Sequence, residues 1–475
     1  MSDENTQDLW VENRFAGQLH RGRGNGVEFV YSEDYLAERT PPVSTAIAKD
    51  RVAHGPDTVT PWIENLVPEG DDTRAAWASH FGEHRTDAFT LLRHMGADAP
   101  GAVQIVPEGT EPETVGGYEE LSDDEIARRI RGIQESDQAW APSADEAIHF
   151  SLAGQQSKFA LARIEDRWFE PSGPAPSTHI VKPGMQGTKN LGFDDQVAEF
   201  ITMRAAKKLG LRVADVDILP FGDTYAFVTT RYDRLVTADG NVKRIHQEDL
   251  CQALSIFPQK KYESDGGPSV ADAVALLSAN STNFEADRTS FSNALAFNLV
   301  AGGIDGHGKN YSILLVGNQV RLAPFYDLIS AYAVYPDSTV HFRGKMGMKY
   351  GKEYRIRGID GRNAARTSDV LGIRRTDFLG TIRAVGERLP ELLAEALSEI
   401  PDIPISDRIK RLPETIGASI EPTIGAMTAD VLTIERWTQP AARVSQTSRV
   451  GQVWVSGHHR DGTWIEGHWR SRPRA

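Results

Sequence analysis

The six-residue loop at 305–310, Asp-Gly-His-Gly-Lys-Asn, constrains the fold of this chain more than any other stretch. An apolar run at 295–302 precedes the loop and ends in a Gly-Gly pair, which predicts a buried helix that stops at an irregular turn. Two short apolar segments follow at 311–316 and 320–323 with Gly-Asn-Gln between them, a pattern that predicts a hairpin. Because a hairpin reverses the chain, we expect Asp327 to return to the neighbourhood of the loop.

Asp305, Asn310 and Asp327 carry the side chains that phosphoryl transfer requires. The Asp-x-x-x-x-Asn spacing is that of a protein-kinase catalytic loop, in which the aspartate orients the attacking hydroxyl and the asparagine holds a metal ion. A second carboxylate such as Asp327 would supply a further oxygen ligand for Mg²⁺. A turn rich in Asp and Asn without chemistry explains the isolated loop equally well, so the rest of the chain has to decide.

Two segments upstream offer groups that bind phosphate. Residues 151–158, Ser-Leu-Ala-Gly-Gln-Gln-Ser-Lys, precede a predicted strand at 159–164, and small residues there let backbone N–H groups approach a polyphosphate. Taken alone, this segment fits an ordinary polar turn better, because it lacks the glycine spacing of the known nucleotide loops. A second strand, 177–182, ends at Lys182, which is either an edge residue or the cation on the α- and β-phosphates of a nucleotide.

A helix and a hinge are expected next. The pattern from 194 to 209 predicts an amphipathic helix followed by a glycine stop. Glu199 in its second turn is a candidate partner for Lys182, with a solvated surface position as the alternative. An apolar strand at 225–230 then enters the polar run 231–234, and in a two-lobed kinase the adenine binds backbone groups at such a hinge.

Seven short motifs follow one another along the chain. They are Ser-x-Ala-Gly-x-Gln-x-Lys at 151–158, His-Ile-x-Lys at 179–182, Arg-Tyr-Asp-Arg at 231–234, Gln-Glu-Asp-x-Cys-Gln at 247–252, Lys-Tyr-Glu-x-x-Gly-Gly-Pro-Ser at 261–269, Asp-Gly-His-x-Lys-Asn at 305–310 and Pro-x-Tyr-Asp at 324–327. This series resembles the HipA family of bacterial serine/threonine kinases, toxins of toxin–antitoxin modules. The resemblance runs from about residue 9 to about residue 396, and it depends on the order of the motifs rather than on any one of them.

The resemblance implies an α+β, two-lobed kinase-like fold of the HipA and phosphoinositide-kinase type that uses ATP and Mg²⁺. It implies Asp305 as the catalytic base, Asn310 and Asp327 as the magnesium ligands, and Lys182 on the ATP phosphates. The further ATP-binding positions that it implies are Ala153, Gly154, Gln155, Gln156, Ser157 and Lys158 in the phosphate loop, Thr230, Arg231 and Tyr232 at the hinge, and His307 in the catalytic loop. For His307, a structural role in the loop is the alternative. Relatives often carry Glu where Thr230 stands, which should alter packing more than activity.

Regulation, substrate and partners are also implied by the resemblance. In this family a serine of the phosphate loop is itself phosphorylated, which expels the loop and silences the enzyme, and Ser151 occupies that position. About two negative charges added beside a triphosphate site would repel ATP. Family members phosphorylate aminoacyl-tRNA synthetases and act with a small DNA-binding HipB-type antitoxin, so that contact with DNA would be indirect.

Two other classes of function remain open. A catalytically silent subunit that acts as co-repressor with a DNA-binding antitoxin is disfavoured, because Lys182, Asp305, Asn310 and Asp327 are all retained. A lipid or small-molecule kinase would share aspects of the fold, but no basic membrane-facing helix supports it. Lys309 would either neutralise the transferring phosphate or be a solvated charge.

Composition agrees with a cytoplasmic enzyme. The 475 residues are 40% hydrophobic, enough for sizeable cores, and the single cysteine, Cys251, excludes an internal disulfide and indicates a reducing compartment. The polar, acidic start has no apolar signal region, and no stretch reaches the roughly 18 apolar residues of a membrane helix, so we expect no membrane contact. The formal charge of −14 argues against general nucleic-acid binding by the whole surface.

The chain is expected to contain five segments. These are a disordered start at 1–8, a β-rich module at 9–107 with a helix at 81–95, a kinase N-lobe with its linker at 108–232, an α-rich C-lobe at 233–438, and a basic tail at 439–475.

The tail differs in charge and pattern from the rest. It holds six arginines against two acidic residues and repeats Trp-x-x-Gly-His-x-Arg at 454–460 and 464–470 around Asp-Gly-Thr. This pattern predicts a hairpin that pairs Arg460 with Trp464 and Trp454 with Arg470. The hairpin would be either a small basic, aromatic contact surface for a partner or DNA, or part of an appendage without a role.

Overall fold

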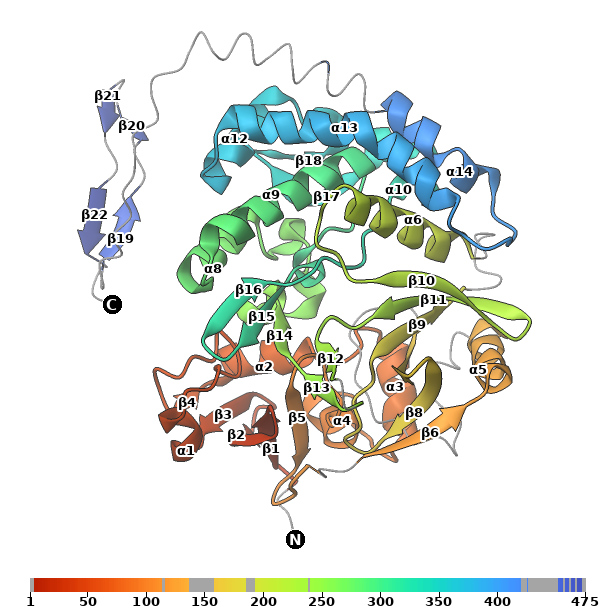
Figure 1. Cartoon of the computed structure of the whole chain (residues 1–475). Helices are drawn as coiled ribbons and strands as arrows, with labels where there is room; N and C mark the ends of the chain where they lie inside the picture. The colour runs from red at the N-terminus through yellow and green to blue at the C-terminus, as the bar shows by residue number, and fades with distance from the viewer. Residues whose placement is uncertain are drawn as a thin grey trace. The chain divides into compact units, whose positions relative to one another are not determined.

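The computed structural model describes residues 4–112, 116–135, 158–184, 193–237, 240–419 and 425, together with four short strands between 452 and 471. The chain divides into two compact units, Met1–Val431 and Leu432–Ala475. In the larger unit the sheets and most of the long helices occupy different regions, an α+β arrangement as expected (Figure 1).

The N-terminal module, residues 6–107, is an antiparallel sheet with four helices. Its elements are β1 (Thr6–Val11), β2 (Arg14–Arg21), β3 (Val27–Tyr31), α1 (Glu33–Ala37), β4 (Ala53–His54), α2 (Pro56–Glu64), α3 (Asp71–His80), α4 (Ala88–Met95) and β5 (Val103–Pro107). The strand order is β4-β3-β2-β1-β5, and alternate residues of β3 face the core, as a sheet with one solvated face requires. The fully buried Trp62 and Trp77 from α2 and α3 fill that core.

Two expectations for this module are wrong in part. The chain is ordered before residue 9, because Gln7 and Asp8 pair with both β2 and β5. The helix expected at 81–95 begins only at Ala88, since the Asp87 carboxylate caps it by accepting a hydrogen bond from the Thr90 backbone N–H.

The second sheet has six strands in the order β10-β11-β9-β7-β8-β6. Its elements are β6 (Gly117–Leu121), α5 (Asp123–Glu135), β7 (Phe159–Ile164), β8 (Arg167–Ser172), β9 (His179–Pro183), α6 (Asp194–Lys208), β10 (Val216–Phe221) and β11 (Thr224–Thr230). The apolar side of α5 packs on one face of this sheet. Strand β9 pairs with β11 on one side and β7 on the other, so Lys182 lies in a central strand and is not an edge residue.

Helices dominate the remainder of the larger unit. The strands are β12 (Arg234–Val236), β13 (Val242–Arg244), β14 (His246–Asp249), β15 (Ser312–Val316), β16 (Gln319–Leu322), β17 (Lys345–Tyr350) and β18 (Glu353–Arg355). The helices are α7 (Leu250–Ala253), α8 (Val270–Asn280), α9 (Phe284–Ala301), α10 (Ala331–Val334), α11 (Asp337–Arg343), α12 (Gly361–Leu371), α13 (Arg375–Leu397), α14 (Asp407–Lys410) and four 3₁₀ turns, η1 (Pro258–Lys260), η2 (Glu263–Asp265), η3 (Gly308–Asn310) and η4 (Ile356–Gly358). The expected hairpin is β15–β16, confirmed to within one residue at each end, and Cys251 is buried in α7 as expected.

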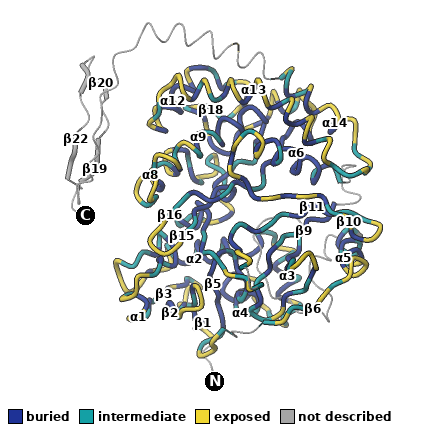
Figure 2. The backbone as a smooth tube through the Cα atoms, in the orientation of Figure 1, coloured by how far each residue is buried: buried dark blue, intermediate teal, exposed yellow. Residues whose placement is uncertain are grey.

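Helix α9 delivers the loop at 305–310 to the middle of the molecule. Its last two turns are buried on all sides, and Figure 2 shows this part of the chain in dark blue. Gly302 ends the helix at φ 66°, and a Cβ there would lie 2.6 Å from the ring of Tyr332. Only glycine fits this left-handed, crowded position, which explains the abrupt stop after the apolar run.

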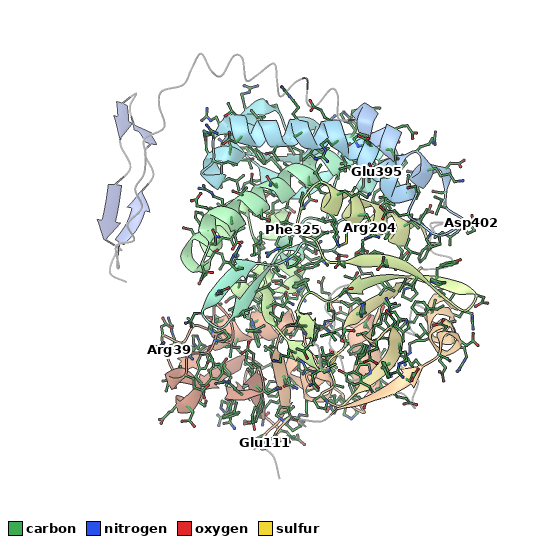
Figure 3. The ribbon with its side chains drawn as sticks, in the orientation of Figure 1. Arg39, Glu111, Arg204, Phe325, Glu395 and Asp402 are labelled. Carbon is green, nitrogen blue, oxygen red and sulfur yellow. The ribbon has the colours of Figure 1, made fainter. Side chains whose placement is uncertain are left out.

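Helices α6 and α13 join the second sheet to the helical region. Arg204 and Glu395 mark these neighbouring helices in Figure 3. Arg204 pairs with Glu399 at 2.9 Å, and Lys208 pairs with Glu395 at 2.8 Å. The apolar faces of both helices belong to one continuous core, which joins the sheet to the helical region.

A buried ionic cluster fixes the N-terminal module to the hinge. Asp98 accepts hydrogen bonds from Arg234 at 2.8 Å, from Arg244 at 3.2 Å and from the Ser177 hydroxyl at 2.7 Å. Burial by itself would raise the pKa of Asp98, but the guanidinium groups around it hold that pKa well below its usual range. The first and last arginines of the Arg-Tyr-Asp-Arg motif therefore serve this docking, since Arg231 also lies 3.5 Å from Asp98.

Glu248 of β14 is buried against the same module without a cation. Its Oε1 accepts hydrogen bonds from the Thr45 backbone N–H and hydroxyl, both at 2.8 Å, whereas its Oε2 has no partner among the described residues. Burial raises the pKa of Glu248 to about 7. This carboxyl group therefore makes the docked module sensitive to pH.

We expect Glu248→Gln to stabilise the protein at pH 8 but not at pH 5. The folded protein binds the Glu248 proton more tightly than the unfolded chain does, because the folded pKa is raised. The resulting stability is fully present below the unfolded pKa of about 4.5 and is lost as the pH rises through about 7. Glutamine keeps the Oε1 acceptor without a charge, so the gain in free energy of unfolding should reach about 3 kcal/mol by pH 8. Thermal denaturation of both proteins between pH 5 and 8 measures it, and a gain that does not change with pH would contradict the buried charge.

The smaller unit contains paired strands, as the hairpin prediction required, but in another register. Strand β19 (Gln452–Val455) pairs with β22 (His468–Ser471), and β20 (His458–Arg460) pairs with β21 (Thr463–Ile465). Arg460 is paired with Thr463 and Trp454 with Trp469, so the predicted pairs Arg460–Trp464 and Trp454–Arg470 are wrong by one residue. The prediction placed three residues in the turn between the two paired strands, whereas the observed turn between Arg460 and Thr463 has two. A shift of one residue changes every cross-strand partner.

No helix in the described part of the chain has the length and apolar character needed to cross a lipid bilayer.

Candidate active site

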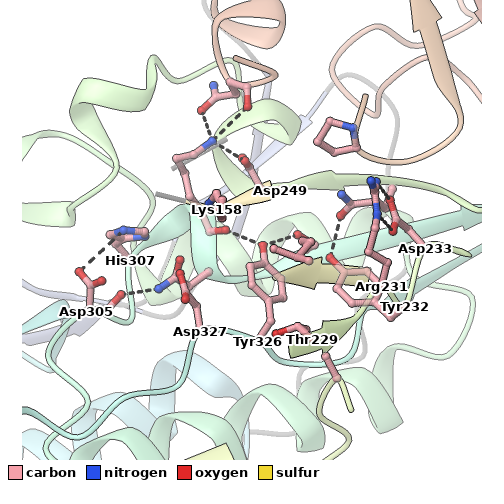
Figure 4. Close-up of a pocket in the computed structure, with 18 of the residues that line it drawn as sticks. Lys158, Thr229, Arg231, Tyr232, Asp233, Asp249, Asp305, His307, Tyr326 and Asp327 are labelled. Atoms are coloured by element: carbon pink, nitrogen blue, oxygen red, sulfur yellow. Dashed lines mark hydrogen bonds and ion pairs between the residues drawn. The ribbon is translucent and has the colours of Figure 1, made fainter. Parts of the chain in front are cut away.

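A cavity of about 430 Å³ lies where the second sheet, the helical region and the N-terminal module meet. Its lining includes the hinge at Thr229 to Asp233, the catalytic-loop residues, Lys182 and three residues of the N-terminal module, Asn65, Glu69 and Pro100. Figure 4 shows Asp305, His307 and Asp327 at one end of the cavity and Tyr232, Arg231 and Asp233 at the other. The arrangement has the two ends that a nucleotide needs, one for the base and one for the phosphates.

Asp305 lines the cavity at the end formed by the catalytic loop, held by its neighbours. Its Oδ1 accepts a hydrogen bond from the Tyr262 hydroxyl, and the Asn310 side-chain amide donates to the Asp305 backbone carbonyl at 2.8 Å. Burial raises the pKa of Asp305, and the hydrogen bond from Tyr262 opposes that rise. The side chain remains 45% exposed, so an incoming hydroxyl group can reach the carboxylate.

Lys182 lies between two carboxylates that come from distant parts of the chain. Its Nζ lies 2.8 Å from Glu199 Oε1 on α6 and 2.7 Å from Asp327 Oδ1. Burial raises the pKa of Glu199 to about 7, while Lys182 and Lys158 hold the pKa of Asp327 below its usual range despite burial. The expected partner of Lys182 is thus in contact with it, and Asp327 has returned to the neighbourhood of the loop.

Asp327 adopts a left-handed backbone with φ 58°. This conformation is uncommon outside glycine, although aspartate tolerates it better than most residues, and such strain concentrates at functional sites. The carboxylate is thereby directed to Lys182 rather than along the strand that precedes it.

Asn310 and Asp327 have the donor atoms of a magnesium site. The Asn310 amide nitrogen donates to Asp305, which leaves its Oδ1 as an acceptor, and Asp327 offers carboxylate oxygens. The described residues contain no group of three or more His, Cys, Asp or Glu side chains arranged to hold a metal ion alone. Two oxygen ligands fit Mg²⁺, because this ion is commonly bound by one or two protein ligands together with phosphate oxygens and water.

His307 is a neutral, buried member of the loop. Burial lowers its pKa to about 3. The ring of Tyr262 meets it edge-on at 4.9 Å between centroids, and its Nε2 lies 3.8 Å from Asp305 Oδ1. It lines the cavity and lies beside the Asp305 carboxylate.

The hinge can receive a planar base through one backbone amide. The N–H of Thr230 donates to the Asp215 carbonyl at 2.8 Å, and that of Arg231 donates to the Thr178 carbonyl at 2.9 Å. Within the described residues, the amide of Tyr232 has no such backbone acceptor.

Two aromatic rings line the cavity beside this hinge. The rings of Tyr232 and Tyr326 lie 5.7 Å apart, and the Tyr232 hydroxyl donates to Gln247 Oε1 at 2.8 Å. The Arg231 side chain, by contrast, is buried against Asp233 and Ser177, so that this residue offers backbone rather than side-chain contacts to a nucleotide.

Lys309 is not a solvated charge. It is buried, and its Nζ donates to Asp249 and to the Asn65 side-chain carbonyl, both at 2.8 Å. The solvated alternative considered from the sequence is therefore wrong, because these bonds fix the catalytic loop to α7 and to the N-terminal module. The role on the transferring phosphate stays a prediction, since Lys309 lines the cavity.

The phosphate-loop residues expected at 151–157, including Ser151, lie outside the described residues. Lys158, the last residue of that motif, lines the cavity, and burial together with the charge of Lys182 lowers its pKa to about 8.

Sequence reasoning missed Tyr262, Asn65 and Glu69. Tyr262 lies within the Lys-Tyr-Glu motif, which is one of the seven that carry the resemblance to the family. That motif was the signal that could have singled it out. Asn65 and Glu69 had no signal of their own, because their partners lie 244 and 192 residues away in the sequence.

Tyr262→Phe should slow phosphoryl transfer by roughly tenfold while changing ATP affinity by less than about twofold. The ring would still pack against His307, but the hydrogen bond that orients the Asp305 carboxylate would be gone. Initial rates and calorimetric ATP titration of the two proteins measure the two quantities. A fall in ATP affinity that matches the fall in rate would contradict the orienting role.

Residues 7–106 match the family model of the HipA N-terminal domain, and residues 150–393 match that of the HipA-like C-terminal domain. A putative kinase of Sinorhizobium fredii, Y4mE, is 32% identical over 417 residues, which cover 86% of this chain and 96% of that protein. The serine/threonine-protein kinase toxin HipA of Shewanella oneidensis is 30% identical over 375 residues, covering 76% of this chain and 82% of the toxin.

A solved structure has the same fold. The complex of Shewanella oneidensis HipA, HipB and operator DNA contains a chain that superposes with a TM-score of 0.74 at 27% identity, covering 89% of this chain and 98% of that one.

Proposed function

Because this chain belongs to the HipA family of serine/threonine-protein kinases, we propose that it transfers the γ-phosphoryl group of magnesium-bound ATP to a serine or threonine of another protein. The support is the meeting of Asp305, Asn310, Asp327 and Lys182 in one cavity, although Lys182 and Asp327 are 145 residues apart in the sequence. A silent co-repressor would have no use for this set, so the enzyme is the better supported of the two functions.

Each residue would perform one part of the reaction. Lys182 would bind the α- and β-phosphates, and the Tyr232 amide with the two tyrosine rings would hold the adenine. Asp305 would receive the proton of the acceptor hydroxyl as that oxygen attacks the γ-phosphorus. Asn310 and Asp327 would hold Mg²⁺, which neutralises charge on the phosphates.

The acceptor and the regulation extend the proposal. We infer that the acceptor protein is a component of translation, such as an aminoacyl-tRNA synthetase. Ser151, in the phosphate loop, would be phosphorylated by the enzyme itself and thereby silence it, because the added charge repels ATP.

The partner would be a small DNA-binding antitoxin of the HipB type. The structural relative that matches 89% of this chain was solved together with HipB and operator DNA. This protein would then meet DNA only through the antitoxin or through its basic tail.

Asp305→Asn should abolish phosphorylation of Ser151 and of any acceptor protein while leaving ATP binding within about threefold of the wild type. The amide has nearly the shape of the carboxylate but accepts no proton. Phosphopeptide mass spectrometry after incubation with ATP and Mg²⁺ gives the first readout, and calorimetry gives the second.

Asp337→Asn on the exposed side of α11 is the matched control and should behave as wild type. If the wild-type protein with ATP and Mg²⁺ phosphorylates neither itself nor any of a panel of aminoacyl-tRNA synthetases, the kinase proposal fails.

A further inference from the structure

Lys261 is a cation of the cavity with no part in the phosphoryl transfer proposed above. Lys261 follows the 3₁₀ turn η1, and its side chain lines the cavity together with Asp305 and His307. Its charge acts on both of these groups, opposing the rise in the pKa of Asp305 and lowering that of His307. Its side chain is 14% exposed, so it is largely buried but still accessible from the cavity.

A residue of the N-terminal module holds this lysine. Glu69 Oε2 lies 2.8 Å from Lys261 Nζ, and the Glu69 side chain is 7% exposed. Its other oxygen, Oε1, is buried without a hydrogen bond among the residues that the structure describes. The pair therefore consists of a lysine and a carboxylate that both line the cavity.

The backbone of Lys261 is fixed to the catalytic loop as well. Its carbonyl accepts a hydrogen bond from the Gly308 N–H at 3.0 Å. A Cβ on Gly308 would lie 2.5 Å from the ring of Pro268, so the two segments touch closely. The backbone position of Lys261 is therefore coupled to that of the loop that carries Asp305.

The remaining described lysines of the cavity are committed elsewhere. Lys182 is bonded to Glu199 and Asp327, and Lys309 is bonded to Asp249 and Asn65. Lys158 interacts electrostatically with Lys182 and Asp327, and also with Glu199 and Glu69. A transferring phosphoryl group spreads negative charge over three oxygens, and a kinase lowers the barrier chiefly by placing cations there.

We propose that Lys261, oriented by Glu69 of the N-terminal module, is the cation that contacts the transferring phosphoryl group; this rests on the kinase function proposed above. In the step, the acceptor oxygen forms a bond to the γ-phosphorus while the bond from that phosphorus to the β–γ bridging oxygen breaks. The acceptor proton passes to the Asp305 carboxylate, and ADP leaves with the bridging oxygen. The Lys261 ammonium contacts the three oxygens of the transferring phosphoryl group. Glu69 is a positioning residue that orients Lys261 for this contact.

The test compares Lys261→Met, Lys261→Arg and Glu69→Gln in the full chain. We expect Lys261→Met to lower kcat by roughly 100-fold with ATP affinity within about threefold, since a transition-state contact is lost. Lys261→Arg should recover most of the rate, and Glu69→Gln should lower kcat by about tenfold. Rates come from labelled ATP and phosphoryl transfer to the protein itself, and affinities come from calorimetry.

The double variant Lys261→Met with Glu69→Gln separates chemistry from folding. It removes both charges, so no carboxylate is left buried without its cation, yet kcat should remain about 100-fold low. Recovery of the rate in the double variant would overturn the proposal, because it would show that the lysine only neutralises Glu69.

Glu64→Gln is the matched control in the same module. Its carboxylate pairs with Arg74 at 2.6 Å, and the two side chains are 14% and 9% exposed, close to the values for the Glu69–Lys261 pair. It touches no catalytic segment, so it should lower thermal stability without changing kcat. Equal losses of kcat in Glu64→Gln and Glu69→Gln would overturn the positioning role, whereas an inactive wild type would instead refute the kinase function itself.

Discussion

The charge of Lys182 is the interaction on which the rest of the site depends. A lysine at the end of a central strand is desolvated by the sheet, and it remains charged because Glu199 and Asp327 both bond to it. Removing one member of such a buried group typically costs about 3–5 kcal/mol, because a charge is left without its counter-ion. The lysine therefore ties the second sheet to α6 and to the strained turn at Asp327, and in doing so it closes the cavity around the place where phosphates would lie.

The N-terminal module acts as a third wall of this cavity. Asp98 holds the hinge arginines, Asn65 holds Lys309 of the catalytic loop, and Glu69 holds Lys261. Contacts at both ends of the cavity mean that the module limits how far the sheet and the helical region can separate. A kinase of two lobes alone would have to supply this restraint by other means.

Local features of the fold could be predicted from the sequence, whereas the contacts between modules could not. The helix stop at Gly302 and the β15–β16 hairpin follow from backbone preferences within a few residues. The ordered start at Thr6 and the pairs made by Asp98 and Glu69 depend on chain segments about 100 to 200 residues away, for which no local pattern exists. Lys309 shows the same limit, because a lysine in a polar loop gives no sign that two distant oxygens will bury it.

Magnesium-dependent binding of ATP tests the central claim most directly. Calorimetric titration of the wild-type protein and of Asp327→Asn with a non-hydrolysable ATP analogue, each with and without Mg²⁺, measures whether the carboxylate beside Lys182 is part of a metal–phosphate site. The account predicts that Mg²⁺ strengthens binding to the wild type by about tenfold or more, and that most of this gain is lost in Asp327→Asn. Equal affinities for the analogue with and without Mg²⁺ in the wild type would contradict it.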